Sequence, residues 1–255
     1  FSMSAVQLSY SASIDYPNQN PTQVIFIDDD GGECNEIGLW DRNSRTCLLT
    51  QDVEKYIHII GSNLTIDGNG HHVQLKKENY MRNLTIDNKQ SDTSTILVLG
   101  NNIVIKNMRI EGFSIRFNQI NQLDSYGISC RQTEEIQIKD SEIFNHAVGI
   151  ACNNAEIKNN KIFSNRKALI VKNCQISDNI ISDNYIGMNL STKNNVENNI
   201  IKNSEYVGFY ISNYDVVSNN IIDKSGFPFH WKGSPHSTIE NNSFLNYQNG
   251  PMGDG

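Results

Sequence analysis

From residue 103 onward the chain repeats one pattern, in which a short apolar run, one or two polar residues and a second apolar run follow each other. The copies read IVIKNMRI, IQIKDSEI, EIKNNKI, QISDNII, NVENNII, VVSNNII and TIENNSF. The last five steps between corresponding polar positions are 19, 19, 20, 21 and 22 residues. A period of roughly 20 residues with several short apolar runs per copy is typical of a β-solenoid.

One copy, residues 156–171, indicates how a coil is built. Its sequence EIKNNKIFSNRKALIV contains three short apolar stretches, with Asn160 between the first two. Asn tolerates the left-handed backbone of a sharp corner, and its amide can bond the Asn of the next coil. The sequence therefore predicts an all-β fold, a single-stranded parallel β-helix with three short strands per coil and an asparagine ladder.

The third strand of each coil follows a small residue, as in VGIACN and VGFYIS. Strict alternation predicts two inward columns on this strand. The first contains Ile128, Ile150, Leu169, Met188, Phe209 and Phe229, and the second contains Cys130, Cys152, Val171, Leu190, Ile211 and Trp231. We expect Cys130 and Cys152 to be buried thiols in place of Val, with a disulfide between the coils as the alternative.

A column of small residues runs beside these strands and consists of Gly127, Gly149, Ala168, Gly187 and Gly208. We expect these residues to relieve backbone strain at the turn into the strand. The alternative is a strip on which a sugar chain could lie against the backbone.

The chain divides into an N-terminal tail and cap (1–60), a β-helix of roughly eight coils (61–250) and a short tail (251–255). Cys34 and Cys47 bracket a loop-rich stretch of the cap, and we expect a disulfide between them. The C-terminal end lacks a cap, so we expect either a further domain or another subunit to cover it. Two long insertions, 76–93 and 112–125, precede the third strand and should wall a groove at one edge of its sheet.

Charge and redox chemistry narrow the function classes. The net charge of −7 and a pI near 5.3 argue against a nucleic-acid or anionic-membrane partner. The chain has no apolar run long enough to cross a bilayer, so no membrane insertion is expected. The expected disulfide favours an exported location, either secreted, at the cell surface or periplasmic.

The stretch GGECNEIGLWDRNSRTCLLTQDV, the later NLTIDGNGHHV and the following I-x-N-N-x-I and x-G-I units resemble the NosD-like right-handed parallel β-helix repeat proteins. Their wider superfamily contains pectate lyases, alginate lyases and mannuronan epimerases. The resemblance covers roughly residues 24–248 and implies right-handed coiling, export, and carbohydrate as the commonest ligand class. The chain has neither the DPHD stretch of the epimerases nor the spaced Asp set and RIK of polygalacturonases. No catalytic residue of these families can therefore be carried over.

Outward positions of the third strand are the candidate site. Tyr210, His230 and Lys232 could supply the acid, the base and the carboxylate-neutralising cation of a uronate lyase or epimerase. Candidate substrate-binding residues are Arg131, Asn153, Lys172 and Asn189. A solvated outer sheet is the alternative. The leading hypothesis is a polysaccharide-directed β-helix that binds, cleaves or epimerises a glycan. The rival is a non-catalytic structural or adhesive module, which presents an adhesive face or assists a metalloenzyme.

Metal ligands show no clear pattern, and no cofactor is assigned. The side chains of His71 and His72 should diverge on a strand, so they should not reach one ion. The run Asp28-Asp29-Asp30 favours a solvated acidic loop, with calcium as the alternative. NosD relatives are associated with copper, but the five Met and six His form no clustered ligand pattern.

Overall fold

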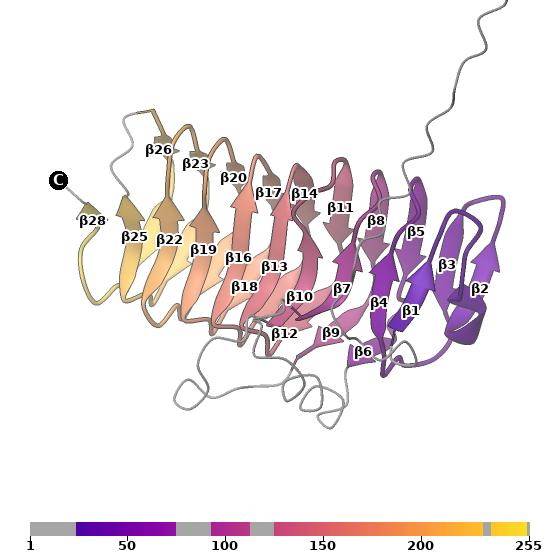
Figure 1. Cartoon of the computed structure of the whole chain (residues 1–255). Coiled ribbons are helices and arrows are strands. Elements are labelled where there is room, and N and C mark those ends of the chain that lie inside the picture. Colours follow the sequence, from indigo (N-terminus) through magenta and orange to yellow (C-terminus); the bar gives the residue numbers. More distant parts are fainter. Residues whose placement is uncertain (1–23, 75–92, 113–124, 232–235, 254–255) are drawn as a thin grey trace, which may run out of the picture.

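A computed structural model describes residues 24–74, 93–112, 125–231 and 236–253, and these residues form the expected parallel β-helix (Figure 1). The chain winds through three sheets, and successive coils stack along one axis. Every strand pair is parallel except β2 with β3. Among the described residues, no helix is long and apolar enough to cross a membrane.

Three long sheets contain the strands. Sheet A consists of β1 (Val24–Ile27), β4 (Tyr56–Ile59), β7 (Thr93–Val98), β10 (Ser125–Cys130), β13 (Val148–Asn153), β16 (Lys167–Lys172), β19 (Ile186–Leu190), β22 (Val207–Ile211), β25 (Phe227–Trp231) and β28 (Met252–Gly253). Sheet B consists of β2 (Gly38–Asp41), β3 (Thr46–Leu49), β5 (Leu64–Asp67), β8 (Ile103–Lys106), β11 (Ile136–Lys139), β14 (Ala155–Lys158), β17 (Gln175–Ser177), β20 (Asn195–Glu197), β23 (Val216–Ser218) and β26 (Thr238–Glu240). Sheet C consists of β6 (His72–Gln74), β9 (Arg109–Glu111), β12 (Glu142–Phe144), β15 (Lys161–Phe163), β18 (Ile180–Ser182), β21 (Ile200–Lys202), β24 (Ile221–Asp223) and β27 (Ser243–Leu245). One short 3-10 helix, η2 (Cys34–Glu36), lies before β2.

The predicted inward columns of the third strand are confirmed in sheet A as far as β22, whereas their last members on β25, Phe229 and Trp231, are only partly buried. Ile128, Ile150, Leu169, Met188 and Phe209 pair in register and are almost completely buried. Each coil therefore adds one aliphatic or aromatic layer to a continuous core, and burial of such a side chain contributes about 1.5–3 kcal/mol. The core needs no helix because each coil covers the previous one.

At the corner between sheets B and C, two neighbouring residues make the sharp turn and the buried hydrogen bonds, both of which we expected of Asn160 alone. Asn159 has the left-handed backbone (φ 55°), and the following residue, Asn160, is buried. The Asn160 amide nitrogen donates to the carbonyls of Ile138 (2.9 Å) and Lys158 (3.0 Å). The assignment of both roles to Asn160 was therefore wrong. The physical reason is that an amide turned into the core satisfies buried carbonyls, whereas the sharp turn is made by its exposed neighbour.

The buried asparagines of this corner form the predicted ladder. Amide-to-amide hydrogen bonds of 2.9–3.1 Å connect Asn160, Asn179, Asn199, Asn220 and Asn242 in that order. The amide oxygens of the last four also accept the backbone N–H of the preceding coil's Asn, and that of Asn160 accepts the backbone N–H of Ser141. The ladder thus satisfies polar groups that would otherwise be buried without partners.

A second buried column lies at the corner between sheets C and A and was not anticipated. Its members are His146, Asn165, Asn184, Ser204 and Ser225. The backbone N–H of His146 donates to Asn165 Oδ1 at 2.9 Å, as an Asn at this position would. Burial lowers the pKa of His146 to about 3, so the imidazole is neutral in the folded protein.

The column of small residues has a packing cause. A Cβ at Gly187 would lie 2.4 Å from the carbonyl oxygen of Gly208 and 3.2 Å from Ile201 Cγ2. Corresponding contacts would occur at Gly127, Gly149 and Gly208. The column thus points toward the neighbouring coil and the core. The small residues therefore have a structural role, as expected, but the cause is the close approach of the next coil's backbone and not strain at the turn. Because the column is buried, it offers no strip for a sugar chain.

Two disulfides cross-link the chain, one within the first winding and one between adjacent coils. The expected bond between Cys34 and Cys47 is confirmed, with a Cα–Cα distance of 5.8 Å. Cys130 and Cys152 also form a disulfide, which corrects the expectation of two free thiols. Their in-register pairing in β10 and β13 brings the Cα atoms to 4.5 Å, within the range that a disulfide spans. Cys174 is a free buried thiol, and burial raises its pKa to about 11.

Several expected features concern residues that the structure does not describe. These are the N-terminal tail 1–23, nearly all of the insertions 76–93 and 112–125, and Lys232. Residues 24–60 contribute β1 and β4 to sheet A and β2 and β3 to sheet B.

Candidate functional site

The outer face of sheet A contains the predicted outward column. Ser129, Ala151, Ile170, Asn189, Tyr210 and His230 pair in register on consecutive strands. The rings of Tyr210 and His230 are therefore neighbours, with centroids 5.1 Å apart and planes inclined by 42°. Asn189 stands beside Tyr210 on the preceding coil. All three side chains are partly exposed.

Three further rings join Tyr210 and His230. Tyr206 lies 6.4 Å from Tyr210 and 5.7 Å from Phe227, and it stacks on Tyr185 with centroids 5.5 Å apart. We call these five side chains, Tyr185, Tyr206, Tyr210, Phe227 and His230, the aromatic cluster. The sequence carried a signal for it, since an aromatic residue immediately precedes the third strand in DNYIGM and SEYVGF and opens it in GFPFH.

The candidate substrate-binding cations lie elsewhere on the same face. Asn153 and Lys172 pair between β13 and β16, and the guanidinium of Arg131 lies 4.4 Å from the centroid of the Tyr126 ring. Strand β10 is four strands before β22 in sheet A, which is roughly 19 Å at about 4.8 Å per strand. The structure therefore brings Tyr210, His230 and Asn189 together but leaves Arg131 far from them. Lys232 lies outside the described residues.

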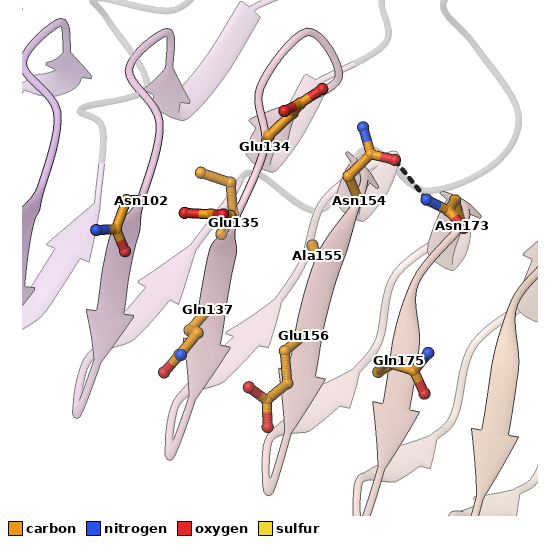
Figure 2. Close-up of a pocket in the computed structure, with 10 residues that line it drawn as sticks. Asn102, Glu134, Glu135, Gln137, Asn154, Ala155, Glu156, Asn173 and Gln175 are labelled. Atoms are coloured by element: carbon orange, nitrogen blue, oxygen red, sulfur yellow. Dashed lines mark hydrogen bonds between the residues drawn. The ribbon is translucent and has the colours of Figure 1, made fainter.

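A groove on the outer face of sheet B was not predicted (Figure 2). Its volume is about 650 Å³, and it lies over β11, β14 and β17 and the corner that precedes them. Its polar lining consists of the amides Asn102, Gln137, Asn154, Asn173 and Gln175 and the carboxylates Glu134, Glu135 and Glu156. We call it the sheet B groove. Sequence reasoning missed it because outward polar residues on a strand look the same whether or not they line a hollow.

Several charged side chains on sheet C are paired with each other. Glu142 lies between Lys161 (3.0 Å) and Arg109 (3.2 Å), and the hydrogen bond from Lys161 is the main reason why its pKa is lowered. His72 Nε2 lies 3.1 Å from a carboxylate oxygen of Glu111. These contacts describe a charge-balanced surface rather than a site with unmatched charge.

The potential metal ligands do not converge. His71 faces Asp52 (3.4 Å) and His72 faces Glu111, so the predicted divergence of the two imidazoles is confirmed. Asp29 of the acidic run pairs with Arg45 at 2.8 Å. Within the described ranges no group of three or more His, Cys, Asp or Glu residues is placed to hold a metal ion.

A family model described as "Periplasmic copper-binding protein (NosD)" matches residues 83–254, about two thirds of the chain. The chain belongs to the NosD family. The resemblance noted in the repeats is thereby confirmed. Because NosD is a periplasmic family, this protein is located in the periplasm, at the cell surface or outside the cell. No curated protein matches the chain significantly.

The copper in the family's description can be compared with the donor atoms of this NosD protein. All six His and all five Cys lie in the described residues. Four cysteines are in disulfides and cannot bind a metal. The fifth, Cys174, is a buried thiol whose pKa is about 11, so it is protonated at neutral pH, whereas copper binds the thiolate. His58 and His146 are each buried in the fold, and burial lowers their pKa to about 4 and about 3. The described residues therefore do not fit a copper centre.

Solved structures share the fold of this NosD protein. An alginate lyase from Paenibacillus sp. str. FPU-7 is 12% identical, with a TM-score of 0.50, and the match covers 82% of this chain and 98% of that one. The mannuronan C-5 epimerase AlgE6 A-module of Azotobacter vinelandii is 16% identical (TM-score 0.46; 76% and 52% covered). The surface adhesin PfbA of Streptococcus pneumoniae is 15% identical (TM-score 0.45; 91% and 79% covered). At these identities the alginate lyase shows a common fold and nothing about activity.

Proposed function

We propose that this NosD-family protein binds a polysaccharide along the outer face of sheet A. The observation that carries the proposal is the aromatic cluster, which places five rings on three consecutive coils beside Asn189. Aromatic side chains offer apolar faces to the C–H surfaces of a sugar ring, and tyrosine adds a hydroxyl at the edge. The amide of Asn189 can both donate to and accept from sugar hydroxyls.

The repeat geometry suits a polymeric ligand. Equivalent outward positions recur at about 4.8 Å along sheet A, so an extended chain could make similar contacts on several coils. Arg131 and Lys172 lie on the N-terminal side of the aromatic cluster and could contact acidic groups farther along the same polymer. The alginate lyase of the same fold acts on alginate, which is support by fold analogy only.

The test is binding of polysaccharides to the wild type and to ring variants. We expect Tyr210→Ala and Tyr206→Ala each to weaken binding roughly five- to tenfold, since loss of one stacked ring costs about 1–1.4 kcal/mol. Tyr214→Ala is the matched control, because Tyr214 is an exposed tyrosine that stacks on His236 outside the cluster. Equal affinities for all four proteins would contradict the proposal.

A catalytic form of the same function is favoured by the proximity of Tyr210 and His230. In a uronate lyase or epimerase, His230 would remove the proton next to the carboxylate and Tyr210 would act as the acid, while Lys232 would neutralise the carboxylate. Lyase activity on alginate or pectate would produce the absorbance of an unsaturated uronate, and Tyr210→Phe and His230→Ala should abolish it. Polysaccharide retention without any product would instead support the non-catalytic, adhesive form.

A further inference from the structure

We propose that the sheet B groove is a second carbohydrate site, and that it selects a neutral glycan rather than a uronate. The groove is on a different sheet from the aromatic cluster, and its lining contains no residue of that cluster. The inference therefore does not depend on binding at sheet A.

The groove is bounded by two rows of hydrogen-bonding side chains (Figure 2). Gln137, Glu156 and Gln175 pair in register on β11, β14 and β17, so one polar group follows another at about 4.8 Å. A second row at the corner contains Asn102, Glu135, Asn154 and Asn173. Amides supply both donors and acceptors, and carboxylates supply acceptors, which together match the paired hydroxyls of a sugar ring.

The corner row is interrupted at Glu135. Asn102 donates to Asn63 at 2.9 Å, and Asn173 donates to Asn154 at 2.7 Å. Between these two pairs the series stops: within the described part of the chain, Asn154 Nδ2 does not donate to Glu135, and the Glu135 carboxylate does not bond to Asn102. The row thus retains a donor at Asn154 and an acceptor at Glu135, both of which line the groove.

The charge of the lining decides which sugar fits. Three carboxylates line the groove, and among the described residues no cationic side chain does. Of the nearby lysines, Lys139 donates to Oε1 of the lining residue Gln137 (3.3 Å) and Lys158 pairs with Asp178 (3.6 Å), so the three carboxylates outnumber the one cation at the edge of the groove. A uronate would be repelled by this lining, whereas neutral hydroxyls can donate charge-assisted hydrogen bonds to it. The carboxylates are also not grouped as metal ligands.

Glu135 offers a variant that separates binding from stability. Its backbone is left-handed (φ 59°), a conformation that Asn adopts at the equivalent positions 63, 102, 154 and 173. Because Asn tolerates this conformation better than Glu, Glu135→Asn should raise Tm while it removes a groove carboxylate. Lys193→Asn is the matched control, since Lys193 has the same backbone (φ 56°) at this corner but does not line the groove.

The experiment is calorimetric titration with neutral hexasaccharides of glucan, mannan and galactan, and with hexamannuronate and hexagalacturonate. We expect a neutral hexasaccharide to bind, Glu135→Asn to weaken it at least tenfold with an increased Tm, and Lys193→Asn to leave affinity unchanged. Glu156→Gln, which removes a charge at constant shape, should also weaken it.

Three results would overturn the inference: binding of no neutral hexasaccharide, preference for a uronate, or wild-type affinity in Glu135→Asn. Calcium bound to the wild type and lost in Glu135→Asn would identify an ion site instead. Tyr210→Ala distinguishes the two faces. If that variant loses the neutral glycan and Glu135→Asn does not, the sugar binds to sheet A, and only the sheet B inference fails.

Discussion

Replacing His146 with Asn tests whether buried polar columns determine the acid stability of this β-helix. His146 occupies a position where the next two coils have Asn165 and Asn184. Those asparagines donate to a carbonyl two residues back and to one on the preceding coil. An Asn at 146 could make the equivalent bonds, and it carries no titratable group.

The magnitude follows from the pKa of the imidazole. Its usual value is 6.5, and burial lowers it to about 3 in the folded protein. Below pH 6.5 the unfolded chain binds a proton that the folded chain does not, so stability is lost as pH falls from 6.5 toward 3. At pH 5 this amounts to about 2 kcal/mol, because each of the 1.5 or so pH units below 6.5 costs about 1.4 kcal/mol.

The assay is urea unfolding at pH 7.5 and pH 5.0, followed by circular dichroism with the disulfides intact. The smaller side chain of His146→Asn loses core packing, and this cost in stability is the same at both values of pH. We expect the variant to improve relative to wild type by about 2 kcal/mol between pH 7.5 and 5.0. Ser164→Asn is the control, since it changes an uncharged corner residue (φ 56°) and should shift both values equally. An equal difference at both values of pH for His146→Asn would refute the reasoning.

Three further predictions concern the ladder, the core and the metal. Asn179→Ala should destabilise the fold by about 3 kcal/mol, since it leaves the carbonyls of Ile157 and Ser177 without their buried donor. Asn242→Ala, at the more exposed end of the ladder, should cost about 1 kcal/mol, and chemical unfolding measures both values. Gly187→Ala should cost about 2 kcal/mol or more because its Cβ would meet the Gly208 carbonyl, and a Tm equal to wild type would contradict the packing account. Titration with Cu(II) of the protein with both disulfides intact should give no stoichiometric site, and one tightly held equivalent would contradict the conclusion that the described residues do not form a copper centre.

The period of the sequence was sufficient to predict the fold and which residues stack. Residues about 20 apart had to become neighbours, so the columns through Ile150 and through Tyr210 followed from spacing and alternation alone. This works because one register applies to every coil, and an error of one residue would have turned all the inward side chains outward.

Other features depend on directions that spacing does not contain. The sequence placed Cys130 and Cys152 on adjacent coils, but distance alone did not decide between two thiols and a disulfide. The pair Asn159-Asn160 gave no indication of which residue turns inward. The sheet B groove depends on how Glu135 and its neighbours are set at a corner, and exposed polar residues have no periodic constraint from packing.

The bond between Cys130 and Cys152 has a mechanical consequence. It closes residues 130–152 into a ring that contains one complete winding of the backbone. Tension applied to the two ends of the oxidised protein can peel coils from either side but cannot lengthen that winding. The stretched, disulfide-bonded chain is therefore shorter than the reduced chain by roughly 70 Å, at about 3.3 Å for each residue enclosed in the ring. Under shear, the protein would thus keep a covalently closed segment near the middle of the chain, from which the neighbouring coils can fold again.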